Sequence, residues 1–363
     1  MNRRNVLKSV IAAASALATS TIGLRGEAVV SASDTDAKRR RTGLGLVEYC
    51  LGIKRRAMKR EDASANPFEP TMFLDACHAL GAGGIQMNLG VRDEASCEGL
   101  RQKAQQYGMF IEGIIGPPRK ESDVERFERQ VKTAARAGVR AVRTVIIPGR
   151  RYEYFDSLEK FREFDARGRR SLELAAPVVE KHQVPLAVEN HKDHRIEQRV
   201  SLLKHIDSEY VGACVDTGNN LALLEDPVEL AKALAPWAKS VHLKDQAVRE
   251  YEDGFLLGDV PLGQGCIDLK AIVDILRNQC PGICFSLELI TRDALKVPCL
   301  SEKYWATFPD VPASDLASIL ALVRANSAEN LQNVSALSQV DQIALEAANV
   351  KSSLEYARET LGI

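Results

Sequence analysis

Four acidic or imidazole residues stand at the ends of four successive apolar segments of strand length in the second half of the chain. They are Glu189, Asp216, His242 and Glu288. A ligand set that is mostly oxygen favours Mn2+ or Mg2+, and admits Co2+, over structural zinc. Three carboxylates that face one another in a low dielectric repel, and a divalent cation is the simplest relief. The pattern therefore predicts one divalent metal ion bound by these four residues.

The residues two positions before the four candidate ligands are all small. Because side chains alternate along a strand, they would share the inward face with the ligands. They are Ala187, Cys214, Ser240 and Ser286, and the residues between are Val188, Val215, Val241 and Leu287. Small inward residues suit a crowded interior and large outward ones suit packing against helices. The pattern thus agrees with four strand ends that converge.

Segments of strand length alternate with segments of helical period from about residue 43 onward. The expected strands are 44–53, 84–87, 109–115, 141–147, 185–189, 211–216, 240–243 and 283–289. The expected helices between them are 71–80, 94–107, 121–137, 158–181, 197–206, 227–235 and 269–277. Repeated strand–helix units with eight strands predict an α/β protein, a (β/α)8 TIM barrel, whose active site lies at the C-terminal strand ends.

The expected organisation has four parts: an export signal at 1–32, a linker at 33–42, the catalytic barrel at 43–296, and a C-terminal loop and helical extension at 297–363. In the extension, a helix at 313–325 could serve as the eighth barrel helix. Apolar residues in 343–361 recur on one helix face, which is typical of a helix packed on the barrel exterior. A dimer contact, and hence a homo-oligomer, is the alternative.

The first 32 residues have the pattern of an export signal. Arg3 and Arg4 precede a short, weakly apolar stretch, 10–22, and a small-residue stretch, 30–32, follows it. The apolar stretch is too short for a stable membrane span, and the order Arg-Arg-x-Val-Leu-Lys resembles a twin-arginine signal. We therefore expect export to the periplasm or another extracytoplasmic space, with a Sec signal or a disordered basic tail as alternatives. An exported protein would not meet the phosphorylated metabolites of the cytosol.

The composition is that of an ordinary globular protein and disfavours several partners. Of 363 residues, 45% are hydrophobic and 27% are charged, and the formal net charge is −1. This balance argues against a nucleic-acid partner, and no glycine-rich nucleotide loop occurs at a strand-to-helix turn. The eight cysteines form no CxxC pair. They are expected to be buried free thiols rather than a disulfide framework.

Short motifs around the candidate ligands resemble those of the xylose-isomerase-like TIM-barrel superfamily, the sugar phosphate isomerase/epimerase group. They are VENH at 188–191, VDTGN at 215–219, VHLKD at 241–245, LE at 287–288 and PLGQG at 261–265, and the resemblance covers roughly residues 43–295. It implies one bound divalent ion, Mn2+ first of all, and a sugar isomerase or epimerase acting on a small carbohydrate. It also implies that Glu189 and Glu288 exchange a proton on either face of a metal-bound enediolate.

Departures from the epimerase pattern leave a second activity open. Asn219 and Val248 stand where ketose epimerases often carry a His and a substrate-binding Arg. His191 follows Glu189 by two residues, as in relatives that cleave 3-keto glycosides by β-elimination, where this His is the proposed base. A metal-dependent sugar dehydratase or β-eliminating lyase is therefore the alternative. His191 is either a catalytic base or a hydrogen-bond partner of Glu189.

Two basic residues complete the candidate site. Lys244 shares the inward parity of His242 and could hold a substrate oxyanion, or else pair with Asp245 or Glu288. Arg143, near the end of the fourth expected strand, is a candidate for binding an anionic substrate. A non-catalytic sugar-binding protein is less favoured because all four ligands are present. The related abasic-site endonucleases need additional His residues that this chain lacks.

Overall fold

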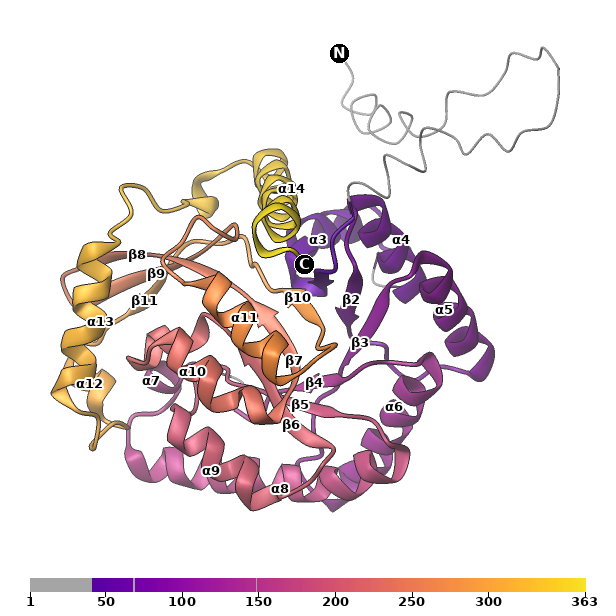
Figure 1. The fold of residues 1–363 in the computed structure, drawn as a ribbon, viewed down its shortest axis with the longest axis horizontal. Helices are drawn as coiled ribbons and strands as arrows, with labels where there is room; N and C mark the ends of the chain where they lie inside the picture. Colours follow the sequence, from indigo (N-terminus) through magenta and orange to yellow (C-terminus); the bar gives the residue numbers. More distant parts are fainter. Residues whose placement is uncertain (1–40, 68, 148) are drawn as a thin grey trace, which may run out of the picture. The chain divides into compact units, whose positions relative to one another are not determined.

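A computed structural model describes residues 41–363 with the exception of 68 and 148. The predicted export signal and all but the last two residues of the predicted linker lie outside the described residues. Within them, eight strands form a closed barrel in the order β1-β10-β7-β6-β5-β4-β3-β2, and each neighbouring pair is parallel. The predicted (β/α)8 TIM barrel is therefore confirmed (Figure 1).

The barrel strands are β1 (Gly45–Val47), β2 (Gly84–Met87), β3 (Phe110–Ile114), β4 (Val142–Thr144), β5 (Leu186–Glu189), β6 (Val211–Asp216), β7 (Ala238–Leu243) and β10 (Phe285–Leu287). The longer helices before the C-terminal region are α3 (Gly52–Glu61), α4 (Pro70–Leu80), α5 (Glu94–Tyr107), α6 (Val124–Ala137), α8 (Leu158–His182), α9 (Ile196–Ile206), α10 (Pro227–Leu234) and α11 (Leu269–Gln279). Short helices α7 (Arg151–Tyr154) and α12 (Glu302–Trp305) lie in loops.

The first strand is shorter than predicted. The expected strand 44–53 ends at Val47, and the chain continues through the 3-10 turn Glu48–Leu51 into α3. Buried Cys50, Leu51 and Ile53 belong to this turn and helix. Because a short buried apolar run has no clear period, the turn was indistinguishable from a strand in the sequence.

The N-terminal end of the barrel interior is filled by one aromatic ring. Phe110 on β3 lies across β1 and β2, where Gly45 and Gly84 leave room for it. A Cβ atom at Gly84 would lie 2.5 Å from three Phe110 ring atoms, so these glycines are required by close approach. The ring closes the end of the barrel opposite the candidate ligands.

The eighth helical position is filled by the C-terminal helix and not by the helix that the sequence suggested. Helix α13 (Ala313–Ala325) has the predicted bounds but packs against β8, outside the barrel, so its expected role was wrong. Helix α14 (Gln339–Tyr356) lies beside α3 (Figure 1), and Glu346 accepts hydrogen bonds from the backbone N–H groups of Ile53 and Lys54 at 2.6 and 2.9 Å. Arg277 of α11 donates to the carbonyl of Leu361 at 3.2 Å. The C-terminus thus packs on the barrel exterior between α11 and α3.

A small antiparallel sheet follows β7 and was not predicted. It consists of β8 (Asp245–Tyr251), β9 (Gly254–Val260) and β11 (Leu295–Val297), in the order β11-β9-β8. The turn between β8 and β9 is Glu252-Asp253, and the Asp253-Gly254 pair at its end is an available hairpin signal. The sheet extends the C-terminal end of the barrel, because β8 begins two residues after β7 ends.

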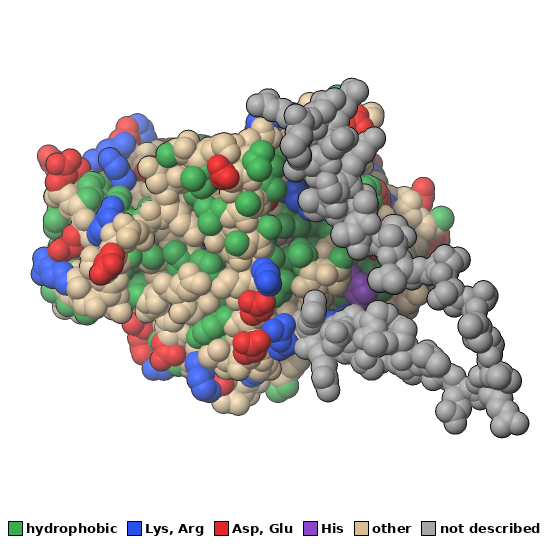
Figure 2. Space-filling model, turned by 90° about the horizontal axis from the view of Figure 1, so that it is seen from above, with side chains coloured by type: hydrophobic (Ala, Val, Ile, Leu, Met, Phe, Trp, Pro, Cys, Tyr) green, Lys and Arg blue, Asp and Glu red, His purple; other side chains and the backbone are tan. Residues whose placement is uncertain are grey.

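The described surface carries mixed charges. On the face shown in Figure 2, basic and acidic side chains are interspersed with small groups of hydrophobic ones. The eight cysteines form no disulfide within the described residues, and five of them are buried as predicted, whereas Cys266, Cys280 and Cys284 are partly exposed. Among the helices of the described residues, none combines the length and the apolarity needed to cross a bilayer.

Candidate metal centre and active-site pocket

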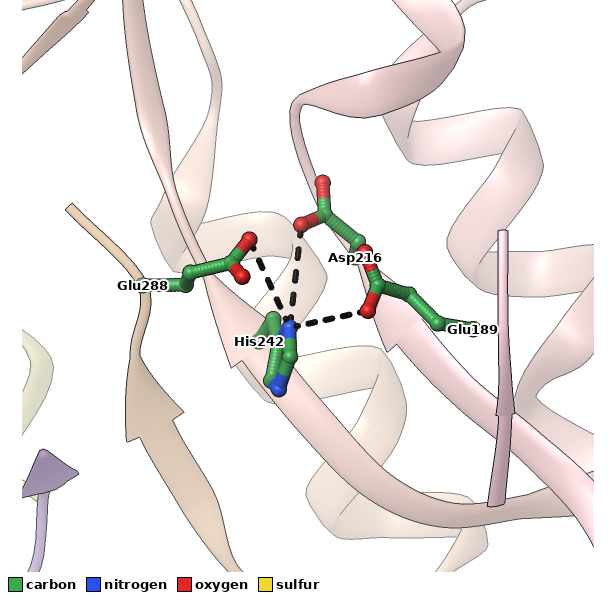
Figure 3. Close-up of side chains that lie close together, drawn as sticks. All are labelled: Glu189, Asp216, His242 and Glu288. Carbon is green, nitrogen blue, oxygen red and sulfur yellow. Dashed lines mark ion pairs between the residues drawn. The ribbon is translucent and has the colours of Figure 1, made fainter. Parts of the chain in front are cut away.

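The four predicted ligands converge at the C-terminal ends of β5, β6, β7 and β10. One potential ligand atom from each of Glu189, Asp216, His242 and Glu288 lies within 4.8 Å of the others, and all four residues are buried. Figure 3 shows the three carboxylates gathered around one nitrogen of the His242 ring. The parity inferred from the sequence is also observed, since Ser240 and Ser286 point into the barrel toward Glu112.

The spacing and the unpaired atoms of this cluster fit a divalent cation. His242 Nδ1 lies 3.7, 3.9 and 3.6 Å from oxygens of Glu189, Asp216 and Glu288, too far for hydrogen bonds. Two ligands that each bind an ion at about 2.0–2.2 Å can be up to about 4.4 Å apart, so an ion fits between them. His242 Nδ1 and Asp216 Oδ2 are buried and have no hydrogen-bond partner among the described residues, although Lys244 Nζ lies 3.2 Å from Asp216 Oδ2 as an ion pair. Such atoms are costly to bury unless something binds them.

The turn after β6 fixes Asp216. Its Oδ1 accepts from the N–H groups of Gly218 and Asn219 at 2.9 and 2.8 Å, which leaves Oδ2 directed at the cluster. Asn190 joins β5 to β6, because its amide oxygen accepts from Asp216 N and its amide nitrogen donates to Asp216 O at 2.8 and 2.9 Å. Thr217 joins β6 to β7 through Lys244. The motif residues around Asp216 therefore position one carboxylate oxygen.

Glu189 is held between a cation and an amide. Arg143 forms a buried ion pair with Glu189 Oε2, and Asn219 Nδ2 donates to Oε1 at 3.1 Å. Arg199 donates to the Glu189 carbonyl at 2.9 Å and pairs with Asp193 at 2.7 Å, which anchors the following loop. Arg143, a candidate for binding an anionic substrate, is thus engaged with a candidate ligand.

Lys244 pairs with Glu288, which is one of the two roles predicted for it from the sequence. Its Nζ lies 2.7 Å from Glu288 Oε2 and 3.2 Å from Asp216 Oδ2. Asp245, the other acidic partner considered, instead accepts from the N–H groups of Gly263 and Gly265 at 2.8 and 2.9 Å. Asp245 therefore shapes the PLGQG loop and does not pair with Lys244.

The surroundings of the three carboxyl groups shift their pKa values in different directions. Burial raises the pKa of Asp216 to about 6, an effect that Lys244 only partly offsets. Burial also acts on Glu288 and Glu189, but the cations beside them, Lys244 and Arg143, bring the pKa of each below its ordinary value. At neutral pH the cluster therefore contains ionised carboxylates that are balanced by fixed positive charges.

A polar layer beneath the cluster orients His242. Its Nε2 lies 2.7 Å from Gln86 Oε1, while Gln86 Nε2 donates to Glu112 at 2.8 Å. Because Glu112 also accepts from Ser240 and Ser286, the Gln86 amide must present its oxygen to His242. With an ion bound, the imidazole would carry its proton on Nε2 and present the Nδ1 lone pair to the ion. Without an ion, burial lowers the pKa of His242, but Cys214 and Glu288 more than offset this effect and hold it above its ordinary value. Gln86 and Glu112 were not singled out in the sequence, although both are polar residues within otherwise buried strands.

Removal of the Gln86 amide should weaken metal binding. In Gln86→Met the imidazole loses the acceptor that sets its tautomer, so we expect the dissociation constant for Mn2+ to rise about 10–100-fold, as for other groups that orient metal ligands. Calorimetric titration of Mn2+ into the metal-free protein measures this change. The exposed Gln264→Met is the matched control, and equal affinities in the two variants would contradict the assigned orientation.

Glu112 should make folding stability depend on pH. Burial raises its pKa to about 7, whereas the ordinary value is 4.5. The folded protein therefore binds this proton more tightly than the unfolded chain, and stability is highest at low pH and lost as pH rises through 7. The loss should reach up to about 3 kcal/mol. Urea unfolding of the metal-free protein from pH 4.5 to 8 should show a weaker pH dependence in Glu112→Gln. The exposed Glu209→Gln should behave as the parent, and identical profiles in all three proteins would reject the assignment.

A pocket of about 420 Å3 opens beside the cluster. Its lining includes Glu288 from the cluster and Lys244, which pairs with it, together with His191 and Lys192 from the loop after β5, and Arg150 and Arg292. This volume lies in the range of small-molecule sites, about 300–1,000 Å3. The pocket gives a small ligand direct access to Glu288 of the cluster and to Lys244 beside it.

His191 lines the pocket. Its Nδ1 is buried and forms no hydrogen bond with the described residues, and no hydrogen bond joins its side chain to Glu189. Burial lowers the pKa of His191, although Glu189 opposes this effect. The geometry thus disfavours a hydrogen-bond partnership with Glu189, and the catalytic role of His191 stays a prediction.

The fold and the cluster define a (β/α)8 barrel protein with a candidate centre for one cation at the strand ends. The model of the xylose isomerase-like TIM barrel family matches residues 74–307 of the chain. This match spans more than half of the sequence, and the protein belongs to that family. The resemblance seen in the motifs is therefore confirmed.

Several known proteins are similar to this one. The 3-oxo-isoapionate decarboxylase of Pectobacterium atrosepticum is 26% identical over 219 residues, which cover 58% of this chain and 74% of that protein. A crystal structure of D-psicose 3-epimerase has a TM-score of 0.54 at 14% identity and covers 88% of this chain and 99% of its own. A crystal structure of the probable 3-DHS dehydratase of Bacillus anthracis has a TM-score of 0.52 at 14% identity. The match covers 79% of this chain and 99% of that chain. At these identities, the two structures show a shared fold.

Proposed function

We propose that this protein is a divalent-metal-dependent sugar isomerase or epimerase that moves a proton next to a carbonyl group. The observation that carries this proposal is the convergence of three buried carboxylates and one imidazole beside a pocket of about 420 Å3. Glu189, Asp216, His242 and Glu288 would hold the ion, with Mn2+ as the first choice and Mg2+ or Co2+ as substitutes. The ion would polarise the substrate carbonyl as a Lewis acid.

The protein side chains around the ion would carry the proton. Glu189 and Glu288 reach the cluster from β5 and β10, with β6 and β7 between them, so they approach the substrate from different sides. One carboxylate would remove the proton from the carbon next to the carbonyl, and the other would return a proton to the resulting enediolate. Lys244 contacts two of the carboxylates and lines the pocket, so its ammonium group can stabilise negative charge on the substrate oxygen.

Proton NMR in D2O tests the proposal directly. Protein loaded with Mg2+, which does not broaden the spectra as Mn2+ does, is incubated with free ketoses, sugar acids and 3-keto glycosides, and Mn2+-loaded protein is assayed after removal of the metal. Deuterium next to the carbonyl together with a new isomer is the expected result. The absence of exchange with every substrate in both metal forms would reject the proposed activity. Calorimetric sugar binding without exchange would then favour the binding-protein interpretation.

A metal-dependent lyase is the second candidate. His191 supports it, because this residue lines the pocket and its Nδ1 has no hydrogen-bond partner in the described part of the chain. The similarity to a decarboxylase also supports it, because decarboxylation next to a carbonyl passes through an enolate as isomerisation does. The NMR assay distinguishes the candidates, because a lyase yields an enone, a released aglycone or carbon dioxide. His191→Asn should abolish a lyase reaction and leave proton exchange by Glu189 and Glu288 intact.

A further inference from the structure

Lys192 is a buried cation that the proposed proton transfer does not use. Its side chain lines the pocket, the residue is only 4% exposed, and its Nζ contacts the neutral amide oxygen of Asn219. Among the described residues, no carboxylate lies within ion-pair distance of it. The pocket's other long cations are all paired, Lys244 with Glu288, Arg150 with Glu153, and Arg292 with Asp259. Burial lowers the pKa of Lys192 to about 8, so most of the side chain is still protonated at neutral pH. A buried charge without a counter-ion is expensive, and a ligand that supplies the missing negative charge would relieve this cost.

The loop after β5 holds Lys192 in an unusual backbone conformation. Its φ angle is +59°, a left-handed value that non-glycine residues rarely adopt and that costs about 1–3 kcal/mol. The neighbouring Asp193 maintains this conformation, because it accepts from the N–H groups of His191 and His194 at 3.0 and 2.7 Å and pairs with Arg199. The Lys192 carbonyl accepts from Arg151 N at 3.0 Å. Hydrogen bonds and an ion pair therefore hold the loop in place at Lys192 and at the residues next to it.

The charges around the pocket leave room for an anion. The three buried carboxylates of the cluster, Glu189, Asp216 and Glu288, are balanced by three buried cations, Arg143, Lys244 and Lys192. The buried acidic residues nearby are satisfied separately, because Asp193 and Asp259 pair with Arg199 and Arg292 and Asp245 accepts from backbone N–H groups. A divalent ion held by the three carboxylates would leave two positive charges in this low-dielectric region. A neutral sugar would leave them uncompensated, whereas an anionic substrate would neutralise at least one.

Asn219 places Lys192 close to the reacting part of the site. The same amide oxygen contacts Lys192 and lies 3.4 Å from Lys244 Nζ, and the amide nitrogen donates to Glu189 at 3.1 Å. The Lys192 ammonium group is therefore separated from a candidate ligand by a single amide. An anionic group bound to it would lie near the carbons that exchange protons and not at the far end of a long substrate.

We propose that the substrate is a sugar acid whose carboxylate pairs with Lys192. This inference rests on the proposed function, whose substrate class it narrows. A carboxylate fits better than a phosphate, because a phosphate dianion is usually bound by several free donors or an Arg fork. Arg150 and Arg292 are already engaged with acidic side chains and are about one-third exposed. One buried Lys matches the single charge of a carboxylate.

Ligand binding tests the inference without turnover. Calorimetry with the Mg2+-loaded full-length protein compares D-gluconate with D-gluconamide and D-glucuronate with D-glucuronamide, so that each pair differs only in the charge of one group. In at least one pair, we expect the acid to bind at least about tenfold more tightly, as for a hydrogen bond to a charged group. Lys192→Met should remove this preference and Lys192→Arg should retain much of it. The exposed Lys204→Met is the matched control and should behave as the parent.

The outcomes separate this inference from the proposed function. Equal binding of acid and amide in both pairs, or a preference that survives Lys192→Met, would overturn the sugar-acid inference. Tighter binding of D-glucose 6-phosphate than of either acid would also overturn it. Deuterium exchange into a neutral ketose in the same preparation would still support the proposed function. Conversely, an acid preference that depends on Lys192, without any exchange reaction, would support the anion site and count against the enzyme. Circular dichroism of Lys192→Met and Lys192→Arg verifies that the loop substitution leaves the fold unchanged.

Discussion

Glu189→Gln and Glu288→Gln should each lower turnover by at least about a hundredfold, the usual contribution of a general acid or base. Each substitution keeps the size of the side chain but removes a proton acceptor and one negative charge of the candidate metal centre. Glu189→Gln also leaves Arg143 without its buried partner, so we expect a lower melting temperature with the barrel still folded. Steady-state assays and circular dichroism on the same samples measure the two effects separately.

The two variants also distinguish the roles of the carboxylates. If the enzyme is an epimerase, each carboxylate exchanges the proton on one side of the reacting carbon. Loss of one carboxylate should then confine residual deuterium exchange to one of the two epimers, and the other variant should show the opposite preference. The exposed Glu209→Gln serves as the control. Full activity in both cluster variants would refute the proposed mechanism.

Removal of the divalent ion should abolish turnover without unfolding the protein. The three carboxylates of the metal-free cluster are partly neutralised by Arg143 and Lys244, which lie in ion-pair contact with them. The barrel should therefore persist after chelation, with a lower melting temperature. At an ion concentration 100 times the dissociation constant, rebinding should add about 2.7 kcal/mol to the free energy of unfolding.

Chelation with EDTA followed by titration of Mn2+, Mg2+ or Co2+ measures activity and melting temperature together. Both should return over the same range of ion concentration, because one site controls both. Asp216→Asn is the matched variant, since it weakens the ligand set while the turn that holds residue 216 can still form through the amide oxygen. Full activity after exhaustive chelation would show that the proposed metal dependence is wrong.

The sequence by itself determined the barrel and the residues at its strand ends. Strands and helices alternate in a local pattern, because buried parallel strands are continuously apolar and the covering helices have one apolar face. The candidate ligands could be selected because parallel strands bring their C-terminal ends to one side, so that distant residues such as Glu189 and Glu288 must approach one another. The alternation of side chains along each strand then indicated which residues point into the barrel, including Ser240 and Ser286.

The tertiary structure alone decided which groups surround those ligands. The eighth helical position belongs to α14, because Glu346 can accept from the free N–H groups of α3. The helix α13 has an apolar face as well, and no local pattern states which surface it covers. The same limit applies to Arg143 and Gln86, whose partners Glu189 and His242 are 46 and 156 residues away. Lys192 had no signal in the sequence, because its burial and its lack of a counter-ion depend on how the loop after β5 folds over the pocket. Local periodicity determines which element forms, whereas packing between distant elements determines which charges remain for a substrate to neutralise.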